Sequence, residues 1–272
     1  MANSTSNLLR LHVAYDGSSY HGWQTQPDVR TVEGELTRAA AQILAEPAEE
    51  VKVQGASRTD AGVHAFGQVA HLVCDKERSL WEFVRGLNAL TPNDICVNRV
   101  EPAAQGFHAR HSAGGKVYRY EIWKHRFDHP FKRRRTWRIA YHLDTDRMRR
   151  AAERMVGTHD FEAFRAADCA SPTSERTMRR VDIEEDDRYV TITVEGDAFL
   201  KYMVRVMVGT LVEIGAGQSP PTLIDDLFAS GNRHHAGVTA PARGLTLLQV
   251  HYPDFPWQSE PPSIGGQYLP GE

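Results

Sequence analysis

One short segment, residues 58–65, holds the side chains best suited to chemistry. It lies between two apolar runs, residues 51–53 and 69–73, that are typical of strands. A loop at such a corner is where a rigid scaffold holds a reactive side chain in the open. The segment places the carboxylate of Asp60 two residues after the guanidinium of Arg58. From the residue types alone, a surface turn with a weak local ion pair is the commoner explanation.

A second basic position and an aromatic one could assist such a carboxylate. Lys201 and Arg205 are the only charged residues from 199 to 212, and a spacing of four puts them on one face of a helix. They could form a narrow solvent-facing stripe, or they could line a cleft in which Arg205 meets a carboxylate, with Asp60 the natural candidate. Tyr118 shares one strand face with Tyr120, so its ring could pack in a sheet or stack on an exposed base.

Hydrophobic periodicity predicts the same order of elements twice. The first half gives strands and helices in the order β-α-β-β-α-β, which is the ferredoxin-like arrangement, and the second half repeats it. We therefore expect an α+β fold of two tandem ferredoxin-like halves with antiparallel sheets and with helices on one face. In the first half we expect strands at 9–13, 51–54, 68–74 and 95–100, and helices at 32–44 and 80–89. In the second half we expect strands at 117–123, 178–183, 189–194 and 245–252, and helices at 144–157, 199–214 and 221–228.

The same pattern predicts where the chain divides. Residues 1–7 are expected to be a flexible N-terminus, and residues 253–272, rich in Pro and Gly, a loose tail. Between them we expect an N-terminal domain over 8–108, which carries the 58–65 loop, and a C-terminal domain over 109–252. A length of 272 residues suits two ordinary domains.

Composition points to a soluble cytoplasmic protein. Hydrophobic residues make up 41% of the chain and charged residues 25%, which is ordinary for a globular protein. No apolar stretch is long enough to span a bilayer, and the first ten residues lack the apolar core of a secretory signal. Three widely separated cysteines, Cys74, Cys96 and Cys169, fit a reducing compartment better than a disulfide framework.

Charge is distributed unevenly along the chain. The net charge is −3, but residues 110–154 contain 14 Lys plus Arg against 5 Asp plus Glu, so that segment carries +9 and the remainder −12. Its densest part is the run of four basic residues at 132–135. This run could be a solvated loop that aids solubility, or a phosphate-contacting surface whose binding weakens with salt.

Metal and cofactor signals are weak. The chain has 13 histidines, but no His or Cys cluster has the spacing of a ligand set, and there is neither a P-loop nor a Rossmann fingerprint. We therefore expect no metal and no cofactor.

Residues 55–71, GASRTDAGVHAFGQVAH, resemble the signature segment of the tRNA pseudouridine synthases of the TruA family. The resemblance runs in family order across about residues 8–252, although Ser57 stands where many members carry Gly. Four further pairs of segments carry it: YDG at 15–17 with GWQ at 22–24, FHAR at 107–110 with YRY at 118–120, MVR at 203–205 with VG at 208–209, and APA at 240–242 with GL at 244–245.

The resemblance implies isomerisation of uridine to pseudouridine in tRNA, a reaction without a cofactor. The N1–C1′ bond breaks, the uracil turns, and C5 bonds to C1′. Asp60 is implied as the nucleophile, Tyr118 as a substrate contact, and Arg205 as a partner that holds the pKa of Asp60 low. Whether Asp60 attacks C1′ or abstracts a sugar proton stays open. Because the base must leave its stack, Arg58 is a candidate for holding the flipped nucleotide or the vacated space, with help from Arg110.

The resemblance also implies a target and an assembly. The target would be uridines 38, 39 and 40 of the tRNA anticodon arm. The protein would be a homodimer whose subunits both contact the tRNA, and the catalytic cleft would lie between the two halves of the chain.

Two alternative functions stay open. A non-catalytic RNA-binding protein with two ferredoxin-like modules is disfavoured, because an RNP1 pattern is matched only at Phe66, Gly67 and Val69. A hydrolase of nucleoside glycosidic bonds would release free uracil.

Overall fold

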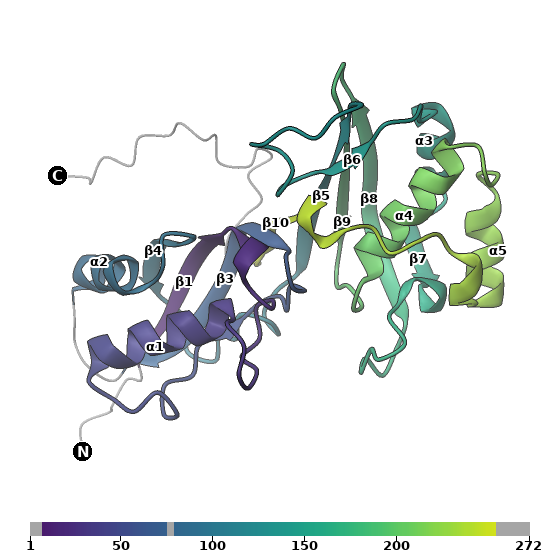
Figure 1. Cartoon of the computed structure of the whole chain (residues 1–272). Helices are drawn as coiled ribbons and strands as arrows, with labels where there is room; N and C mark the ends of the chain where they lie inside the picture. Colours follow the sequence, from purple (N-terminus) through teal and green to yellow (C-terminus); the bar gives the residue numbers. More distant parts are fainter. Residues whose placement is uncertain (1–6, 75–78, 254–272) are drawn as a thin grey trace.

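The computed structural model describes residues 7–74 and 79–253, and its fold combines one large, mostly antiparallel sheet with helices (Figure 1). The strands follow one another across the sheet in the order β4-β1-β3-β10-β5-β9-β8-β7, while β2 pairs with β3 and β6 with β5. The segments expected to be loose, 1–7 and 253–272, lie almost entirely outside the described residues.

The first half of the chain forms one end of the sheet and two helices that cover one of its faces (Figure 1). Both helices begin at a side-chain cap, because Thr31 accepts a hydrogen bond from the Gly34 amide and Ser79 accepts one from the Glu82 amide. The elements are β1 (Asn7–Tyr15), α1 (Val32–Leu44), β2 (Gln54–Gly55), β3 (His64–Cys74), α2 (Leu80–Leu90) and β4 (Ile95–Pro102), with a 3-10 turn at Gly17–Ser19.

The second half forms the other end of the sheet and the remaining helices. Its longest helix, α4, is buried on most sides, as its apolar sequence predicts. The elements are β5 (Gly115–Lys124), β6 (Trp137–Ile139), α3 (Thr145–Glu153), β7 (Gly157–Asp160), β8 (Glu175–Glu185), β9 (Tyr189–Gly196), α4 (Met203–Gly215), α5 (Leu223–Ser230) and β10 (Leu245–His251). Three further 3-10 turns cover Glu162–Phe164, Arg233–His235 and Ala242–Gly244.

The last strand joins the two halves. β10 pairs antiparallel with β5 along most of its length, and it also pairs in parallel with β3, where Thr246 lies opposite His64 and Leu247 opposite Ala65. The sheets expected from the two halves are therefore one continuous sheet. An unpaired strand edge is a liability, and β10 covers the edges of β3 and β5 at once.

Two sequence expectations about local structure are wrong. The strand expected over 51–54 is reduced to β2, two residues that pair with β3. The helix expected from residue 199 begins at Met203, because Tyr202 adopts a left-handed backbone conformation with φ of 65°. Lys201 therefore precedes the helix and does not share a helical face with Arg205; it pairs with Asp168 instead.

Candidate active site

The loop that carries Asp60 connects β2 to β3 and is fixed by backbone hydrogen bonds to a neighbouring loop. The amide of Trp23 donates to the carbonyl of Thr59 at 3.0 Å, and the amide of Gly62 donates to the carbonyl of Tyr20 at 3.3 Å. Gly62 has a φ of 79°, a conformation that favours glycine. The corner is therefore rigid around Asp60.

Gln68, in the middle of β3, braces the same loop from beneath. Its fully buried amide accepts a hydrogen bond from the Ser57 amide at 3.1 Å and donates one to the Ser57 carbonyl at 2.7 Å. Thr59 is fixed separately, because its hydroxyl lies 2.7 Å from that of Tyr15. No motif predicted this contact; the available signal in the sequence was a lone Gln in an apolar run.

Asp60 and Arg205 form a largely buried ion pair that connects the two halves. The Arg205 Nη1 donates to the Asp60 Oδ2 at 3.0 Å, and the two side chains are 14% and 19% exposed. Arg205 is itself held, since its Nε donates to the Ala240 carbonyl at 2.8 Å and its guanidinium lies over the Tyr202 ring. The contact suggested for Arg205 is present, and Arg205 is not part of a solvent-facing stripe.

Burial and charge act in opposite directions on Asp60. Burial raises the pKa of the Asp60 carboxyl above its ordinary value, while the hydrogen bond and charge of Arg205 lower it and offset only part of the increase. The expectation that Arg205 holds this pKa low is therefore wrong in its net direction, because removal from water is the larger effect.

Tyr118 lies at the same junction and is held from both halves. Its hydroxyl is 2.7 Å from that of Ser57, and its ring packs edge-on against Phe199, with centroids 5.1 Å apart. Burial raises the pKa of Tyr118, so its phenol stays protonated at neutral pH. The departure from glycine at Ser57 thus has a structural consequence, because only a side chain can make this bond.

The two remaining arginines expected at the site point to solvent. Arg58 is exposed on the loop, and within the described ranges its guanidinium has no ion-pair or hydrogen-bond partner. Arg110 is also exposed, in the segment that precedes β5. The structure therefore brings together Asp60, Arg205 and Tyr118, and it leaves Arg58 and Arg110 available at the surface.

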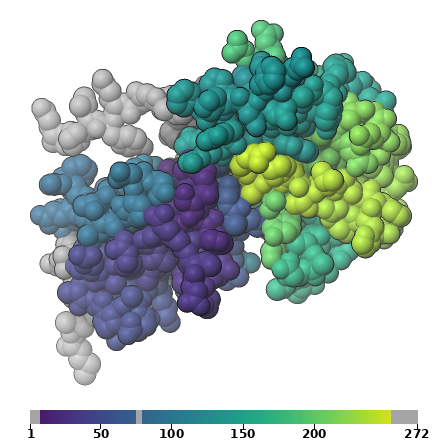
Figure 2. Space-filling view, viewed as in Figure 1, coloured from purple at the N-terminus to yellow at the C-terminus, as the bar shows by residue number. Residues whose placement is uncertain are grey.

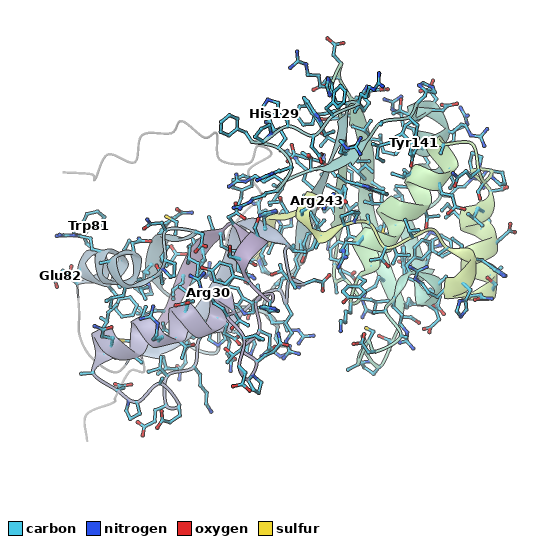
Figure 3. All side chains as sticks on the ribbon, in the orientation of Figure 1. Arg30, Trp81, Glu82, His129, Tyr141 and Arg243 are labelled. Carbon is cyan, nitrogen blue, oxygen red and sulfur yellow. The ribbon has the colours of Figure 1, made fainter. Side chains whose placement is uncertain are left out.

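The basic run at 132–135 is attached to the loop that carries Asp60. His64 accepts a hydrogen bond from the Gly17 amide at Nδ1, and its Nε2 lies 3.0 Å from the Arg134 carbonyl. Arg135 pairs with Asp16 at 3.2 Å, and Arg243 donates to the carbonyl of Thr136 at 3.1 Å. Figure 3 shows Arg243 at the junction of the two halves, beneath the loop that carries His129. His64 was not singled out from the sequence, because its partners, the Asp16 carboxylate and three backbone groups, lie far along the chain.

Two other kinds of site are absent from the part of the chain that the structure describes. There, no group of three or more His, Cys, Asp or Glu side chains could hold a metal ion. No helix among the same residues has both the length and the apolar character needed to cross a membrane.

Comparison with known proteins identifies the family. A family model of tRNA pseudouridine synthases matches residues 11–112 and 151–253. The tRNA pseudouridine synthase A of Acetivibrio thermocellus is 42% identical over 244 residues, which cover 90% of this chain and 99% of the relative. The protein of the same name from Myxococcus xanthus is 41% identical, over 91% of this chain and 93% of the relative. The one from Cronobacter sakazakii is 40% identical, over 90% of each.

These matches first define the chain as an isomerase that converts uridine to pseudouridine in RNA, as the sequence predicts. More narrowly, the chain belongs to the tRNA pseudouridine synthase family. The matched segments include Asp60 and Arg205, whereas Tyr118 lies in the stretch between them.

Proposed function

We propose that this chain isomerises uridine at positions 38, 39 and 40 of the tRNA anticodon arm, with Asp60 as the nucleophile. The observation that carries the proposal is the Asp60–Arg205 pair, a buried carboxylate on a rigid corner of the family's signature segment. A carboxylate next to C1′ can capture or stabilise the positive charge that develops when the N1–C1′ bond breaks.

The geometry leaves one carboxylate oxygen of Asp60 for the substrate. Arg205 binds Oδ2, and within the described ranges Oδ1 accepts no hydrogen bond. Oδ1 is therefore the oxygen that would bond to C1′ while Arg205 holds the other. Uracil leaves with the electron pair of the broken bond on N1, stays in the site and turns. C5 then bonds to C1′ as the Oδ1–C1′ bond breaks, which restores the Asp60 carboxylate; the C5 proton leaves to solvent and N1 takes up a proton. Burial favours the reaction, because a carboxylate removed from water is less stabilised before it attacks.

The other expected residues would hold the flipped nucleotide. Tyr118 offers a ring at the junction of the two halves, where a base out of its stack can be contacted. Arg58 is exposed two residues from Asp60 and has no partner among the residues that the structure describes, so it can occupy the space that the base leaves or bind the displaced strand. Arg110 would assist from the segment before β5.

We also propose that the fold consists of two ferredoxin-like halves, 8–108 and 109–252. The antiparallel strand orders β4-β1-β3-β2 and β10-β5-β9-β8 support this division, as do the helices on one face of each half. Figure 2 shows the surface hollowed between the purple-to-blue half and the green half, beside the yellow segment. This hollow is where the RNA would enter. The contacts between Asp60 and Arg205 and between Ser57 and Tyr118 bridge the two halves.

The remaining features of the proposal come from family membership. We propose that the protein acts as a homodimer whose two subunits contact one tRNA, and that it acts in the cytoplasm, which its free cysteines support. Sedimentation of the purified protein, alone and with tRNA, tests the dimer. A monomer at micromolar concentration would contradict it.

Mapping of the modified positions tests the target. An unmodified tRNA transcript with uridines at 38, 39 and 40 is incubated with the protein, treated with a carbodiimide that labels pseudouridine, and reverse transcribed. We expect stops at those three positions and no release of free uracil. Stops only elsewhere in the tRNA would reject the anticodon-arm assignment, and free uracil would favour a hydrolase.

A further inference from the structure

Lys116 is a largely buried cation that the described contacts leave without a partner. It lies on β5 two residues before Tyr118, so both side chains are on the same face of the strand, about 7 Å apart along it. Lys116 is only 9% exposed, and within the described ranges its ammonium makes no hydrogen bond and no ion pair. Its Nζ is not one of the fully buried atoms, so the ammonium reaches solvent at the end of a mostly buried stem and is open to an anion.

The nearest charges make this position strongly positive. Arg110 and Arg176 both lower the pKa of Lys116, which burial together with these two guanidinium groups brings to about 8. Asp197 acts in the other direction but more weakly. Its Oδ1 already accepts hydrogen bonds from the backbone amides of Thr177 and Ala198, so it is not a dedicated partner for Lys116.

The sheet register explains how Arg176 comes to this place. Lys116 lies opposite Gly196 of β9, and Gly196 lies opposite Met178 of β8, so the three form one row across the sheet. Arg176 is two residues before Met178 and therefore on the same face. Its Nη atoms are held by the segment 171–175, while its Nε is buried and has no hydrogen-bond acceptor.

We propose that Lys116, Arg110 and Arg176 form a binding site for a backbone phosphate of the RNA, next to the nucleotide that reacts at Asp60. Three cations grouped at the start of β5, with the Lys116 ammonium open to solvent, match the needs of a phosphate oxygen. The inference deepens the proposed function, since it rests on the RNA entering the hollow between the halves. It assigns Lys116 to holding the strand, not to the bond-breaking step.

A binding experiment with three variants tests the site. The affinity of the full chain for tRNA is measured over a range of salt concentrations for Lys116→Met, Lys116→Arg and the control Arg85→Ala, which removes one charge from the exposed face of α2. We expect Lys116→Met to bind about tenfold more weakly and to reduce the salt slope by about 0.7, the value for one phosphate of a single strand. Lys116→Arg should stay within about twofold of the parent, and Arg85→Ala should change neither value.

Loss of structure is separated from loss of the phosphate contact by thermal unfolding. Because Met replaces a buried charge with an apolar chain of similar length, Lys116→Met should unfold at the same temperature as the parent or above it. Wild-type affinity and salt slope in Lys116→Met would overturn the proposal. A second pair of results would also overturn the proposal: Lys116→Met is unfolded, which explains its weak binding, and the folded Lys116→Arg variant loses affinity as well.

A second measurement locates the phosphate. Single neutral methylphosphonate linkages are placed in turn along an anticodon-arm RNA. At one linkage the parent should lose about as much affinity as Lys116→Met loses, and Lys116→Met should lose nothing further there. If the loss caused by the neutral linkage and the loss caused by Lys116→Met add at every position tested, the proposed phosphate site is wrong. This outcome is distinct from failure of the proposed function, which would show as the absence of pseudouridine formation by the parent protein.

Discussion

At the scale of single residues, two opposed effects set the pKa of the Asp60 carboxyl. Burial raises this pKa and Arg205 lowers it, with burial the stronger. An enzyme that needs this carboxylate ionised must therefore lose activity on acidification at a higher pH than an unperturbed Asp would allow. In the proposed mechanism Arg205 is a positioning residue, because it binds one oxygen of Asp60 and leaves the other for the substrate.

The pH profile tests this balance. The acidic limb of kcat/KM should lie above pH 3.8, the ordinary pKa of Asp, because the fraction of ionised Asp60 falls as the pH drops through its raised pKa. Arg205→Met removes the contribution that lowers the pKa, so it should reduce the rate and move the limb to higher pH. Single-turnover rates of pseudouridine formation measured from pH 4 to pH 8 locate the acidic limb in the parent protein and in Arg205→Met. A limb that does not move in Arg205→Met contradicts the account.

Ser57 offers a test of how Tyr118 is held. Ser57→Ala removes the hydroxyl 2.7 Å from that of Tyr118 and leaves a buried phenol without this partner, at a cost of about 1–3 kcal/mol. The free energy of unfolding, measured with urea, should fall by that amount, and kcat/KM should fall with it. Tyr118→Phe in the Ser57→Ala background should cost little further stability. Strictly additive losses would show that the two hydroxyls do not interact.

The sequence predicted three residues that the structure brings together, but not the residues that hold their loop in place. Asp60, Arg205 and Tyr118 stand in motifs that can be read along the chain. Gln68 and His64 act through backbone groups of Ser57, Gly17 and Arg134, contacts that no local pattern contains.

At the scale of elements, helix α4 positions Arg205 through a close backbone contact. A Cβ at Gly209 would lie 1.7 Å from the Val238 carbonyl oxygen, so only glycine lets the segment 236–240 lie against the helix. That segment ends at Ala240, whose carbonyl accepts from the Arg205 Nε. The packing of α4 and the position of the guanidinium are therefore coupled.

A matched pair of glycine substitutions tests this coupling. Gly209→Ala should destabilise the protein by about 1–3 kcal/mol and reduce activity, because the backbone must move apart and carry the Arg205 anchor with it. Gly114→Ala is the control, since a Cβ there meets nothing within 4 Å, and it should stay within about 0.5 kcal/mol. Urea unfolding and pseudouridine formation are the two measurements. Equal effects of the two substitutions would reject the role of the close contact.

The elements themselves were largely predictable, and their exceptions have local causes. Helices α1 and α2 follow from apolar periodicity and from the caps Thr31 and Ser79. The late start of α4 depends on the left-handed Tyr202, which no propensity favours. The pairing of β10 with β3 could not be predicted, because strands so far apart in sequence meet only through the tertiary fold.

At the scale of the whole molecule, a basic surface lies on a chain of net charge −3. The loop with residues 132–135 is tied by backbone groups to His64 and Arg243, and Arg135 pairs with Asp16, so the exposed side chains of Arg133 and Arg134 face solvent or RNA. Phe131, beside this run, is 86% exposed, which suits stacking on bases. The overall charge gave no sign of nucleic-acid binding, whereas its distribution along the sequence did.

Removal of the basic run tests its role in binding. Replacing Arg133, Arg134 and Arg135 with Ala should weaken tRNA binding and flatten its dependence on salt, because fewer counterions are released. The fold should persist, since the His64 contact uses the Arg134 carbonyl, which Ala retains. Alanine at Arg85, Arg150 and Arg154 removes the same charge from α2 and from the end of α3 and should leave the slope unchanged. Equal slopes in the two triple variants would exclude the run from the RNA surface.

Asp60 is proposed to be the nucleophile of pseudouridine formation in tRNA, and release of tritium from tRNA labelled at uridine C5 measures this reaction. C5 loses its hydrogen only when the base is reattached through carbon. The parent protein should release tritium, and Asp60→Asn should release it at least about a thousandfold more slowly while still binding tRNA. Substantial release by a clean preparation of Asp60→Asn would contradict the assignment of the nucleophile. No release by the parent, with tRNA bound, would contradict the proposed function itself.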